Sequence, residues 1–285
     1  MIELKARAKI NLSIDVLRKL DNGYHEVRMV MQSIKLHDKI VLEPLKHGIE
    51  IVSDSSMIPL DEGNIAYKAA ELIINRYSIK SGIRIILEKN IPVGAGLGGG
   101  SADAAAVLKG MNKIFSLNIS QEELVLLGKK IGADVPFCIN GGTMLAEGIG
   151  EKLTRLADLG EIPVVLVKPD ITISTPWVYK NFNFDIIKDR PNTELIIKAI
   201  NQGRIDLLAG NLKNVLESVT AEKFTEIKEI KNKLVEYGAQ VSLMSGSGPT
   251  VFGLFEDMAK AENAYRKFKK EKCSCFLTET TNGES

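Results

Sequence analysis

The chain has 285 residues, of which 45% are hydrophobic and 26% are charged, as is ordinary for a globular protein with a substantial core. Its 37 basic and 36 acidic residues leave a formal net charge of +1, so no overall field favours nucleic acid or anionic lipid as a partner. No apolar run approaches the roughly 20 residues of a membrane span, and the N-terminus lacks the pattern of a signal peptide. These features predict a cytoplasmic protein of one large or two modest domains.

Alternating residues at the start of the chain predict two strands, Ile2–Ala8 and Leu12–Val16, joined by Lys9–Asn11. A lysine between strands is usually a solvated surface charge, so residue type alone does not mark Lys9 as functional. The segment Asp21–Glu26 begins as a turn, because Asn-Gly readily supplies positive φ angles. Its tyrosine and histidine fit a loop that caps the core as well as they fit a binding site.

The next part of the chain reads as three strands followed by a helix. The strands are expected at Met29–Leu36, Lys39–Glu43 and Ile49–Ser53, with turns at His37-Asp38 and Lys46–Gly48. Apolar residues at helical spacing predict an amphipathic helix from Asn64 to Tyr77, and Asn64 is most simply its N-cap.

The most informative stretch is Pro92–Ala106, which places five glycines between a predicted strand and a predicted helix. The strand, Ile83–Leu87, is rich in branched aliphatic residues, and the helix, Ala102–Phe115, is rich in Ala, Leu and Met. Glycines let the backbone approach a ligand closely, and the free N–H groups at a helix start attract an anion. Since flexible linkers are rarely placed between a strand and a strong helix, the stretch predicts a phosphate-binding loop.

Two common phosphate-binding motifs fit this loop poorly. A Walker loop ends in Gly-Lys followed by Ser or Thr, and no lysine is present there. The spacing from Gly94 to Gly99 matches the dinucleotide fingerprint literally, but Glu88–Pro92 separates the strand from the first glycine. The acidic residue that should end a second strand instead falls at Glu122, at the start of a helix. A dinucleotide-binding fold is therefore disfavoured.

The chain continues with helices and one strand. A Ser120–Glu123 capping box opens a helix that runs through Lys130. In Gly132–Pro136, residue type alone favours Asp134 as the N-cap of a following helix. A pair of glycines then turns the chain into a strand at Thr143–Ala146.

The residue composition of the chain changes near Ile162–Val167, which reads as a continuous apolar strand suited to burial on both faces of a sheet. The domain boundary is therefore expected near residue 155, which divides the chain into domains of residues 1–155 and 156–285. Beyond it, helices are predicted at Thr193–Gln202, Ile205–Ala209, Glu222–Tyr237 and Asp257–Lys270, and strands at Val241–Met244, Thr250–Phe255 and Cys273–Leu277.

Four smaller features of the second half complete the prediction. Ser174–Tyr179 reads equally as a helix start or as part of a binding site, and Ser245–Gly248 as a tight hairpin turn. Thr278–Ser285 reads as a frayed tail. The odd number of cysteines fits a reducing compartment, and ordinary packing is expected for Cys273, Cys275 and Cys138.

Several motifs, in the right order, resemble the galacto-, homoserine, mevalonate and phosphomevalonate (GHMP) kinase superfamily. Pro92–Ala106 resembles its central ATP-binding motif, and Ala8–Leu12 and Met244–Thr250 resemble the two flanking motifs. Within that superfamily, Gly23–His25 and Gly132–Pro136 resemble the 4-diphosphocytidyl-2-C-methyl-D-erythritol kinases of the non-mevalonate route to isoprenoids. The resemblance covers nearly the whole chain.

The resemblance implies an α+β fold of two domains with the active site in the cleft between them. The N-terminal, ATP-binding domain would be a ribosomal-protein-S5-like α/β domain, and the C-terminal, substrate-side domain would be ferredoxin-like. The implied activity is phosphorylation, by ATP with Mg²⁺, of the 2-hydroxyl of 4-diphosphocytidyl-2-C-methyl-D-erythritol. A sister kinase for homoserine or mevalonate and a non-catalytic ATP-binding relative are the alternatives.

The same resemblance implies the roles of individual residues. Asp134 would accept the proton of the substrate hydroxyl, and Lys9 would stabilise the travelling phosphoryl group. Residues implied in ATP binding are Pro92, Val93, Gly94, Ala95, Gly96, Leu97, Gly98, Gly99, Gly100, Ser101 and Asn64, with Ser101 also the candidate Mg²⁺ ligand. Residues implied in substrate binding are Asn11, Tyr24, His25, Thr175 and Tyr179.

The cytosine end of the substrate is expected between aromatic side chains. Tyr24 would stack on the base, Tyr179 would face it from the other side, and His25 would hydrogen-bond the ring. The family often has an aromatic residue where this chain has Met29-Val-Met31, so a thioether wall is expected there.

Overall fold

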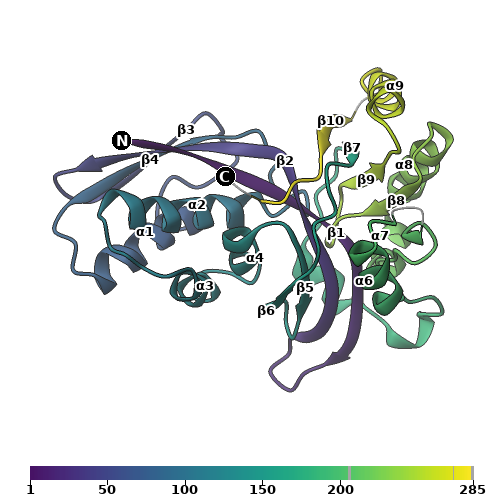
Figure 1. Ribbon diagram of the computed structural model, residues 1–285, viewed down its shortest axis with the longest axis horizontal. Helices are drawn as coiled ribbons and strands as arrows, with labels where there is room; N and C mark the ends of the chain where they lie inside the picture. The colour runs from purple at the N-terminus through teal and green to yellow at the C-terminus, as the bar shows by residue number, and fades with distance from the viewer. Residues whose placement is uncertain (205–206, 272, 284–285) are drawn as a thin grey trace.

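The chain folds into two β-sheets with helices packed on them, in the computed structural model that describes residues 1–204, 207–271 and 273–283 (Figure 1). Within these ranges, the first sheet has the strand order β3-β4-β2-β5-β6, with β1 paired to β2, and the second has the order β10-β7-β9-β8. The first sheet contains β1 (Ile2–Lys19), β2 (His25–Leu45), β3 (Ile49–Ser53), β4 (Gly82–Glu88), β5 (Thr143–Glu147) and β6 (Lys152–Arg155). The second contains β7 (Pro163–Lys168), β8 (Val241–Met244), β9 (Val251–Leu254) and β10 (Ser274–Glu279).

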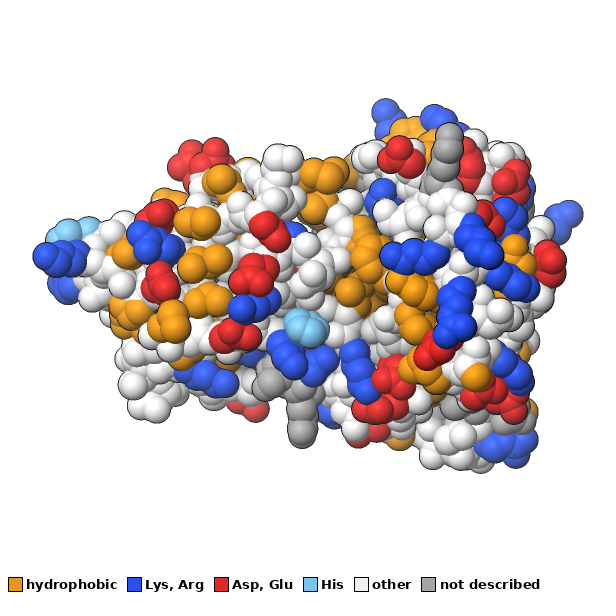
Figure 2. Space-filling view, turned by 90° about the horizontal axis from the view of Figure 1, so that it is seen from above, with side chains coloured by type: hydrophobic (Ala, Val, Ile, Leu, Met, Phe, Trp, Pro, Cys, Tyr) orange, Lys and Arg blue, Asp and Glu red, His pale blue; other side chains and the backbone are white. Residues whose placement is uncertain are grey.

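Helices cover each sheet with their apolar stripes. On the first sheet these are α1 (Ile65–Arg76), α2 (Gly99–Ile114) and α4 (Val135–Asn140), and α3 (Gln121–Lys129) packs on α2 and α4. The second sheet is accompanied by α5 (Thr175–Lys180), the 3₁₀ helix η1 (Phe184–Ile186), α6 (Thr193–Asn201), α7 (Glu217–Lys223), α8 (Thr225–Glu236) and α9 (Met258–Phe268). Basic and acidic side chains are interspersed on the face shown in Figure 2, in keeping with the small net charge. None of the helices in the described ranges combines the length and the apolar character that a membrane crossing requires.

The longest strands, β1 and β2, form a hairpin that reaches both halves of the molecule (Figure 1). The prediction of two strands joined by Lys9–Asn11 is wrong, because these residues lie within β1. Register shifts on both sides of Lys9–Asn11 interrupt the simple alternation of inward and outward side chains. Residues 8–16 are also all buried, because this part of the hairpin packs against the second half of the molecule, so the pattern of one strand looks like two.

The predicted turn at His37-Asp38 is also wrong, because β2 runs through it without a break. Asp38 is fully buried, and its carboxylate accepts hydrogen bonds from the backbone N–H groups of Asn90 and Ile91. An aspartate with such partners occurs within a strand, although residue type alone favours a turn.

Most other predicted elements are confirmed within a few residues. These are the strands at 49–53, 83–87, 143–146, 162–167, 241–244, 250–255 and 273–277, and the helices at 64–77, 102–115, 120–130, 193–202 and 257–270. The exposed strand β6 was not predicted. The single helix predicted at Glu222–Tyr237 is two helices, α7 and α8, which are separated at Phe224 where the backbone is extended. The helix predicted at Ile205–Ala209 includes positions 205 and 206, which lie outside the described residues.

The predicted frayed tail is wrong over the part of it that the structure describes. Strand β10 extends to Glu279, and the buried Thr280 forms a bridge to Ile34 of β2. Its hydroxyl donates a hydrogen bond to the Gly160 carbonyl and accepts one from the Ile162 N–H group. Residues 278–281 are ordered because they return to the first sheet, where the Thr281 N–H group donates to the Ser33 carbonyl and the Thr281 carbonyl accepts from Gln32 Nε2.

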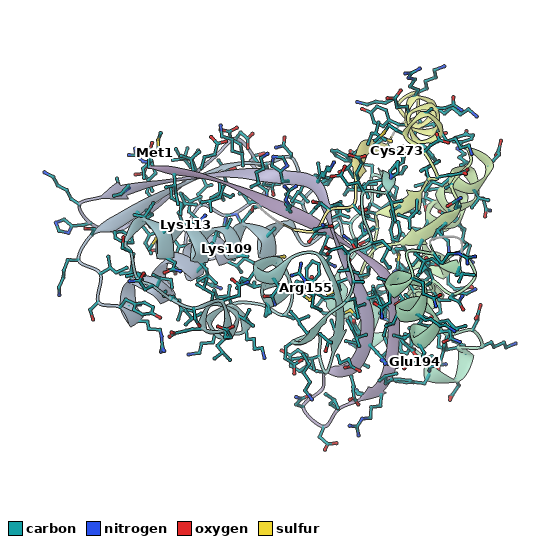
Figure 3. All side chains as sticks on the ribbon, viewed as in Figure 1. Met1, Lys109, Lys113, Arg155, Glu194 and Cys273 are labelled. Carbon is teal, nitrogen blue, oxygen red and sulfur yellow. The ribbon has the colours of Figure 1, made fainter. Side chains whose placement is uncertain are left out.

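The hairpin of β1 and β2 is shared between the two halves of the molecule. Val16 and Val27 lie in one buried cluster with Val165 of β7, whereas Leu4 of β1 packs against the helices of the first sheet. Strand β6 ends at Arg155 in the first sheet, and β7 opens the second sheet (Figure 3). We therefore keep the domain boundary near residue 155 as a proposal.

The three cysteines are free thiols, and all of them pack in or against one hydrophobic cluster. Cys273 lies beside α9, in the half that contains the second sheet (Figure 3), and Cys275 is buried in the core of that half. Cys138 lies on α4, where burial raises the pKa of its thiol well above the usual range. Buried thiols with raised pKa values are unreactive, in agreement with the predicted packing role.

Candidate active site

A cleft of about 980 Å³ lies where the hairpin, the glycine-rich loop, α4 and α5 meet. Residues from both halves of the molecule contribute to its walls, those of the second half from helices and turns. The sequence-predicted residues that line it are Lys9, Asn11, Tyr24, His25, Gly96, Gly98, Ser101, Asp134, Thr175 and Tyr179. The fold thus brings both predicted catalytic residues and all predicted substrate-binding residues to one cavity.

Lys9 projects from β1 and is held by three oxygen atoms. Its Nζ atom donates hydrogen bonds to Asn11 Oδ1 at 2.7 Å and to the Gly96 carbonyl at 3.2 Å. It forms an ion pair with Asp134 Oδ2 at 3.5 Å. The side chain of Lys9 is only 5% exposed, and a buried ammonium persists only with such partners. Its charge is therefore fixed at one point of the cleft.

Asp134 stands at the start of α4, where a capping role was the simplest expectation. Its side chain makes no hydrogen bond to the helix, and 33% of the side chain is exposed to the cleft side of the molecule. Pro136 in the first turn of α4 has no N–H group and therefore requires no capping acceptor. The carboxylate is therefore available to a ligand next to Lys9.

The glycine-rich loop owes its shape to three residues in the left-handed region. Gly94, Gly96 and Gly98 have φ values of +65°, +75° and +71°. A Cβ atom on Gly96 would lie 2.3 Å from the Ser245 carbonyl oxygen, and one on Gly98 would lie 3.0 Å from Lys9 Cγ. Only glycine permits both the backbone angles and these close approaches.

Only part of the predicted ATP-binding stretch lines the cleft. Ala95 and Leu97 are buried in the core, and Pro92, Val93, Gly94, Gly99 and Gly100 lie outside the lining. Asn64 also lies outside it, because its side chain caps α1 by accepting from the Ala66 N–H group at 2.9 Å and donates to the Pro59 carbonyl. The ATP-binding roles of these residues stay predictions.

The far end of the cleft is aromatic. The His25 ring lies 5.2 Å from the Tyr179 ring and 6.1 Å from the Phe184 ring, measured between ring centroids. Tyr24 stands at the rim and is 61% exposed. Phe182 and Phe184 also line the cleft and were missed by sequence reasoning. Two phenylalanines spaced two apart, directly after Tyr179, were the available signal.

The rings of His25 and Tyr179 are neutral at pH 7. Burial, followed by the positive charge of Lys19, lowers the pKa of His25. Burial, followed by the negative charge of Asp134, raises the pKa of Tyr179 to about 12. Neutral rings suit the recognition of an uncharged base.

Of the methionines expected in a thioether wall, only Met29 reaches the cleft, and contact with the base stays a prediction. Met29 lines the cleft, and its sulfur accepts a hydrogen bond from Asn11 Nδ2 at 3.5 Å. Met31 is fully buried and does not line the cleft. Residues two apart on a strand share a face, so Met29 and Met31 pack in the same buried cluster, and Met31 is the more deeply buried of the two.

The turn at Ser245–Gly248 is more than a hairpin connection. The Ser245 hydroxyl donates to the Gly96 carbonyl at 2.9 Å, and the Ser247 and Thr175 hydroxyls lie 2.7 Å apart. Asn214 supports the turn, since its Nδ2 atom donates to the Met244 and Gly246 carbonyls at 2.8 Å. Asn214 had no signal in the sequence, because its partners are distant along the chain.

Two family models match the chain, one described as the GHMP kinases N terminal domain, over residues 64–142, and one as GHMP kinases C terminal, over residues 196–275. The 4-diphosphocytidyl-2-C-methyl-D-erythritol kinase of Acetivibrio thermocellus is 56% identical over 279 residues, which cover 98% of this chain and 99% of that protein. The enzyme of the same name from Clostridium botulinum is 50% identical over 279 residues, which cover 98% and 100% of the two chains.

Solved structures agree with these matches. A crystal structure of 4-(cytidine 5'-diphospho)-2C-methyl-D-erythritol kinase is similar with a TM-score of 0.86 and 33% identity, over 99% of this chain and 100% of that one. Homoserine kinase from Cytophaga hutchinsonii shares the fold, with a TM-score of 0.77 at 18% identity over 99% and 94% of the two chains. The predicted α+β GHMP kinase fold is confirmed. The chain belongs to the 4-diphosphocytidyl-2-C-methyl-D-erythritol kinase family of the GHMP kinases.

Proposed function

We propose that this chain transfers the γ-phosphoryl group of ATP to the 2-hydroxyl of 4-diphosphocytidyl-2-C-methyl-D-erythritol. The observation that carries the proposal is the ion pair of Lys9 and Asp134, which faces the cleft beside the glycine-rich loop. An alcohol placed at this pair would have the loop on one side and the aromatic end of the cleft on the other. That arrangement fits a substrate with a reacting hydroxyl at one end and a base at the other.

Asp134 is the general base in this proposal. The hydroxyl oxygen of the substrate attacks the γ-phosphorus of ATP, the bond from that phosphorus to the bridging oxygen breaks, and ADP leaves. The proton of the hydroxyl passes to the Asp134 carboxylate, as in other phosphoryl transfers that use a positioned acid–base group. A tertiary alcohol is crowded and weakly acidic, so orientation by the carboxylate matters at least as much as its basicity.

Lys9 stabilises the negative charge that spreads over the γ-phosphoryl oxygens in the transition state. Its three partners hold the ammonium in place before the substrate binds, so no reorganisation is needed during the reaction. Asn11 supports this position directly, because its Oδ1 atom accepts a hydrogen bond from Lys9.

The phosphates of ATP would bind the N–H groups of the glycine-rich loop and of the first turn of α2. At the end of the cleft formed by the loop and α2, the α2 residue that lines the cleft is Ser101, which offers a hydroxyl and no carboxylate. These residues fit a Mg²⁺ ion that is held mainly by the phosphates. When bound there with Ser101 as its protein ligand, Mg²⁺ would neutralise phosphate charge. The described residues contain no group of three acidic, His or Cys side chains that would hold a metal alone.

An assay of ADP release decides between this function and its alternatives. We expect turnover with the cytidylyl alcohol and none with homoserine or mevalonate, because the aromatic end of the cleft has no role for those small substrates. Turnover with one of the small alcohols instead would assign the chain to a sister activity. Nucleotide binding without any turnover would make it a non-catalytic relative.

Replacing Tyr24 with alanine should raise KM for the cytidylyl substrate by about 5- to 150-fold. Stacking of a base on an aromatic ring contributes roughly 1–3 kcal/mol, and each 1.4 kcal/mol corresponds to about a factor of ten. KM for ATP serves as the internal control and should not change, because Tyr24 stands at the opposite end of the cleft from the loop. An equal rise in both constants would argue against stacking.

Acidification should weaken binding of the cytidylyl substrate through His25. Because the pKa of His25 is lowered, the ring is neutral at pH 7 and gains a proton only below the ordinary value of about 6.5. We therefore expect KM for this substrate to be constant from pH 9 to pH 7 and to rise below about pH 6.5. A His25→Gln variant should lack the rise, since an amide does not titrate. A rise of equal size in that variant would assign the effect to another group.

A further inference from the structure

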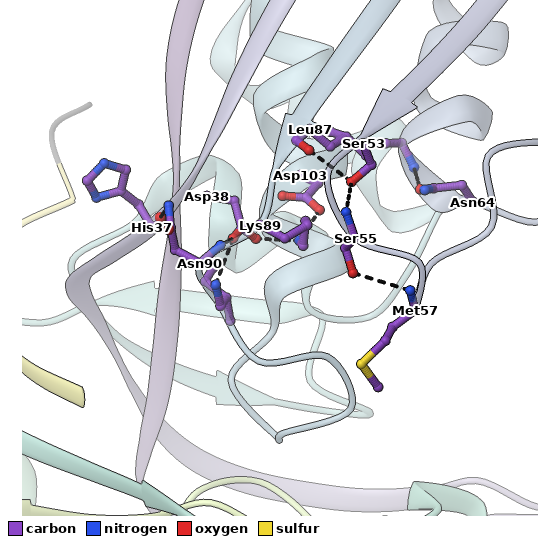
Figure 4. A network of polar contacts seen from close by, with 12 residues as sticks. His37, Asp38, Ser53, Ser55, Met57, Asn64, Leu87, Lys89, Asn90 and Asp103 are labelled. Atoms are coloured by element: carbon purple, nitrogen blue, oxygen red, sulfur yellow. Dashed lines mark hydrogen bonds and ion pairs between the residues drawn. The ribbon is translucent and has the colours of Figure 1, made fainter. Parts of the chain in front are cut away.

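Three charged side chains outside the cleft form a buried cluster beside the glycine-rich loop (Figure 4). We call Asp38, Lys89 and Asp103 the charge cluster. The side chains of these residues are 0%, 6% and 4% exposed, respectively, and none of them lines the cleft. The ammonium of Lys89 lies between the two carboxylates and pairs with both.

The members of the cluster come from the two ends of the loop and from the sheet beneath it. Lys89 directly follows β4 and precedes the loop, Asp103 lies in the second turn of α2 after the loop, and Asp38 lies in β2. Lys89 Nζ donates to Asp103 Oδ2 at 2.5 Å and also bonds Asp38 Oδ2. One ammonium thus connects the entry of the loop, its exit and the sheet.

The backbone at the loop entry is fixed by the same cluster. Asp38 Oδ1 accepts hydrogen bonds from the N–H groups of Asn90 at 2.6 Å and Ile91 at 2.7 Å. The start of α2 packs on this segment, since a Cβ atom on Gly99 would lie 3.1 Å from Ile91 Cγ2 and 3.7 Å from Asp38 Oδ2. The entry and the exit of the loop are therefore in contact through Ile91 and the cluster.

A contribution to stability does not by itself explain why the charge cluster is present. Two carboxylates and one ammonium leave a formal excess of negative charge in the interior, and buried ion pairs are often less stabilising than apolar residues of similar volume. Asp103 Oδ1 is buried without a hydrogen-bond partner among the described residues. The loop that the cluster closes contains several glycines with positive φ, which are free to adopt many conformations unless their ends are held. Holding the ends restricts the loop to the shape that presents its N–H groups to the cleft.

We infer that Lys89, with Asp38 and Asp103, is a positioning residue that holds the two ends of the glycine-rich loop in the geometry that binds the phosphates of ATP. This inference rests on the proposed function, because it takes nucleotide phosphates as the ligand of the loop. No member of the cluster lines the cleft, so the cluster acts only through the loop.

The test uses Asp103→Ala, which breaks the bridge at the loop exit. Lys89 and Asp38 still neutralise each other in this variant, so it should fold. We expect KM for ATP to rise about tenfold, the effect of one lost charge-assisted hydrogen bond, while KM for the acceptor alcohol stays within about twofold. A merely structural role would lower the active fraction and leave both KM values unchanged. Asp103→Asn should restore KM for ATP, since its amide oxygen still accepts from Lys89.

The matched control is Lys39→Met. Lys39 is the neighbour of Asp38 in β2 and also joins two carboxylates, Glu3 at 3.4 Å and Glu88 at 3.3 Å, but at the surface. Both KM values should equal those of the wild type. Should Asp103→Ala fail to fold, Asp103→Leu breaks the same bridge without leaving a cavity, and the same split between the two KM values is expected of it.

Amide hydrogen exchange tests the inference without any ligand. In Asp103→Ala, exchange should accelerate at residues 90–102 and be unchanged in α1. This readout separates the inference from the proposed function, since it holds even if the wild-type protein transfers no phosphoryl group. Unchanged exchange in the loop, or a rise of both KM values by the same factor, would overturn the inference.

Discussion

Replacing Asp134 with alanine lowers kcat by about 10²- to 10⁴-fold, the usual contribution of a positioned acid–base group, and leaves the protein folded. The carboxylate is the group that faces both the cleft and Lys9, so its loss removes the proton acceptor of the substrate hydroxyl. The loss of stability should be small, because the side chain makes no capping hydrogen bond to α4 and Lys9 keeps its hydrogen bonds to Asn11 and the Gly96 carbonyl. The measurements are kcat with both substrates saturating and Tm of the same preparation.

Asp257→Ala is the matched control for this variant. Asp257 also precedes a helix, but its Oδ1 atom does accept a capping hydrogen bond, from the Lys260 N–H group at 2.8 Å. Its replacement should destabilise the protein by about 1 kcal/mol and leave kcat unchanged. A pair of variants with opposite effects on kcat and Tm separates catalysis from capping. Near-normal turnover in Asp134→Ala would remove this residue from the mechanism.

Replacing Gly96 with alanine should abolish productive binding of ATP. Its φ of +75° is unfavourable for alanine, and the added Cβ atom would lie 2.3 Å from the Ser245 carbonyl oxygen. Both sides of this contact are backbone, so the clash is relieved only if the loop moves away from Ser245. That movement would break the hydrogen bonds that Ser245 and Lys9 donate to the Gly96 carbonyl. Since a displacement of about 1 Å costs roughly 10²-fold in rate, we expect kcat/KM for ATP to fall at least that far.

Gly94→Ala is the control for the conformational part of this effect. Gly94 has a similar φ of +65°, but no atom lies within 4 Å of a Cβ atom built on it. Its replacement should cost only about 1–2 kcal/mol of stability from the left-handed conformation. If Gly96→Ala behaves like Gly94→Ala, the contact with Ser245 has no role in ATP binding.

The local structure of the site could be predicted where short-range patterns are strong. The strand before the glycine-rich loop, the helix after it and the N-cap at Asn64 follow from propensity and capping, and the structure confirms them. Predictions failed where a polar residue inside a strand has distant partners. Asp38 reads as a turn residue because its hydrogen bonds go to Asn90 and Ile91, which are remote in sequence.

The glycine-rich loop, its place between a strand and a helix, and the motifs that identify the family could all be read from the order of residues. These are properties of neighbouring residues, because propensity, periodicity and glycine spacing act over a few positions. The tertiary structure decided that Lys9 lies inside a strand opposite Asp134, that Phe184 joins the aromatic end, and that Lys89 bridges the ends of the loop. Such contacts depend on strand register and on the packing of distant segments, which no local pattern encodes.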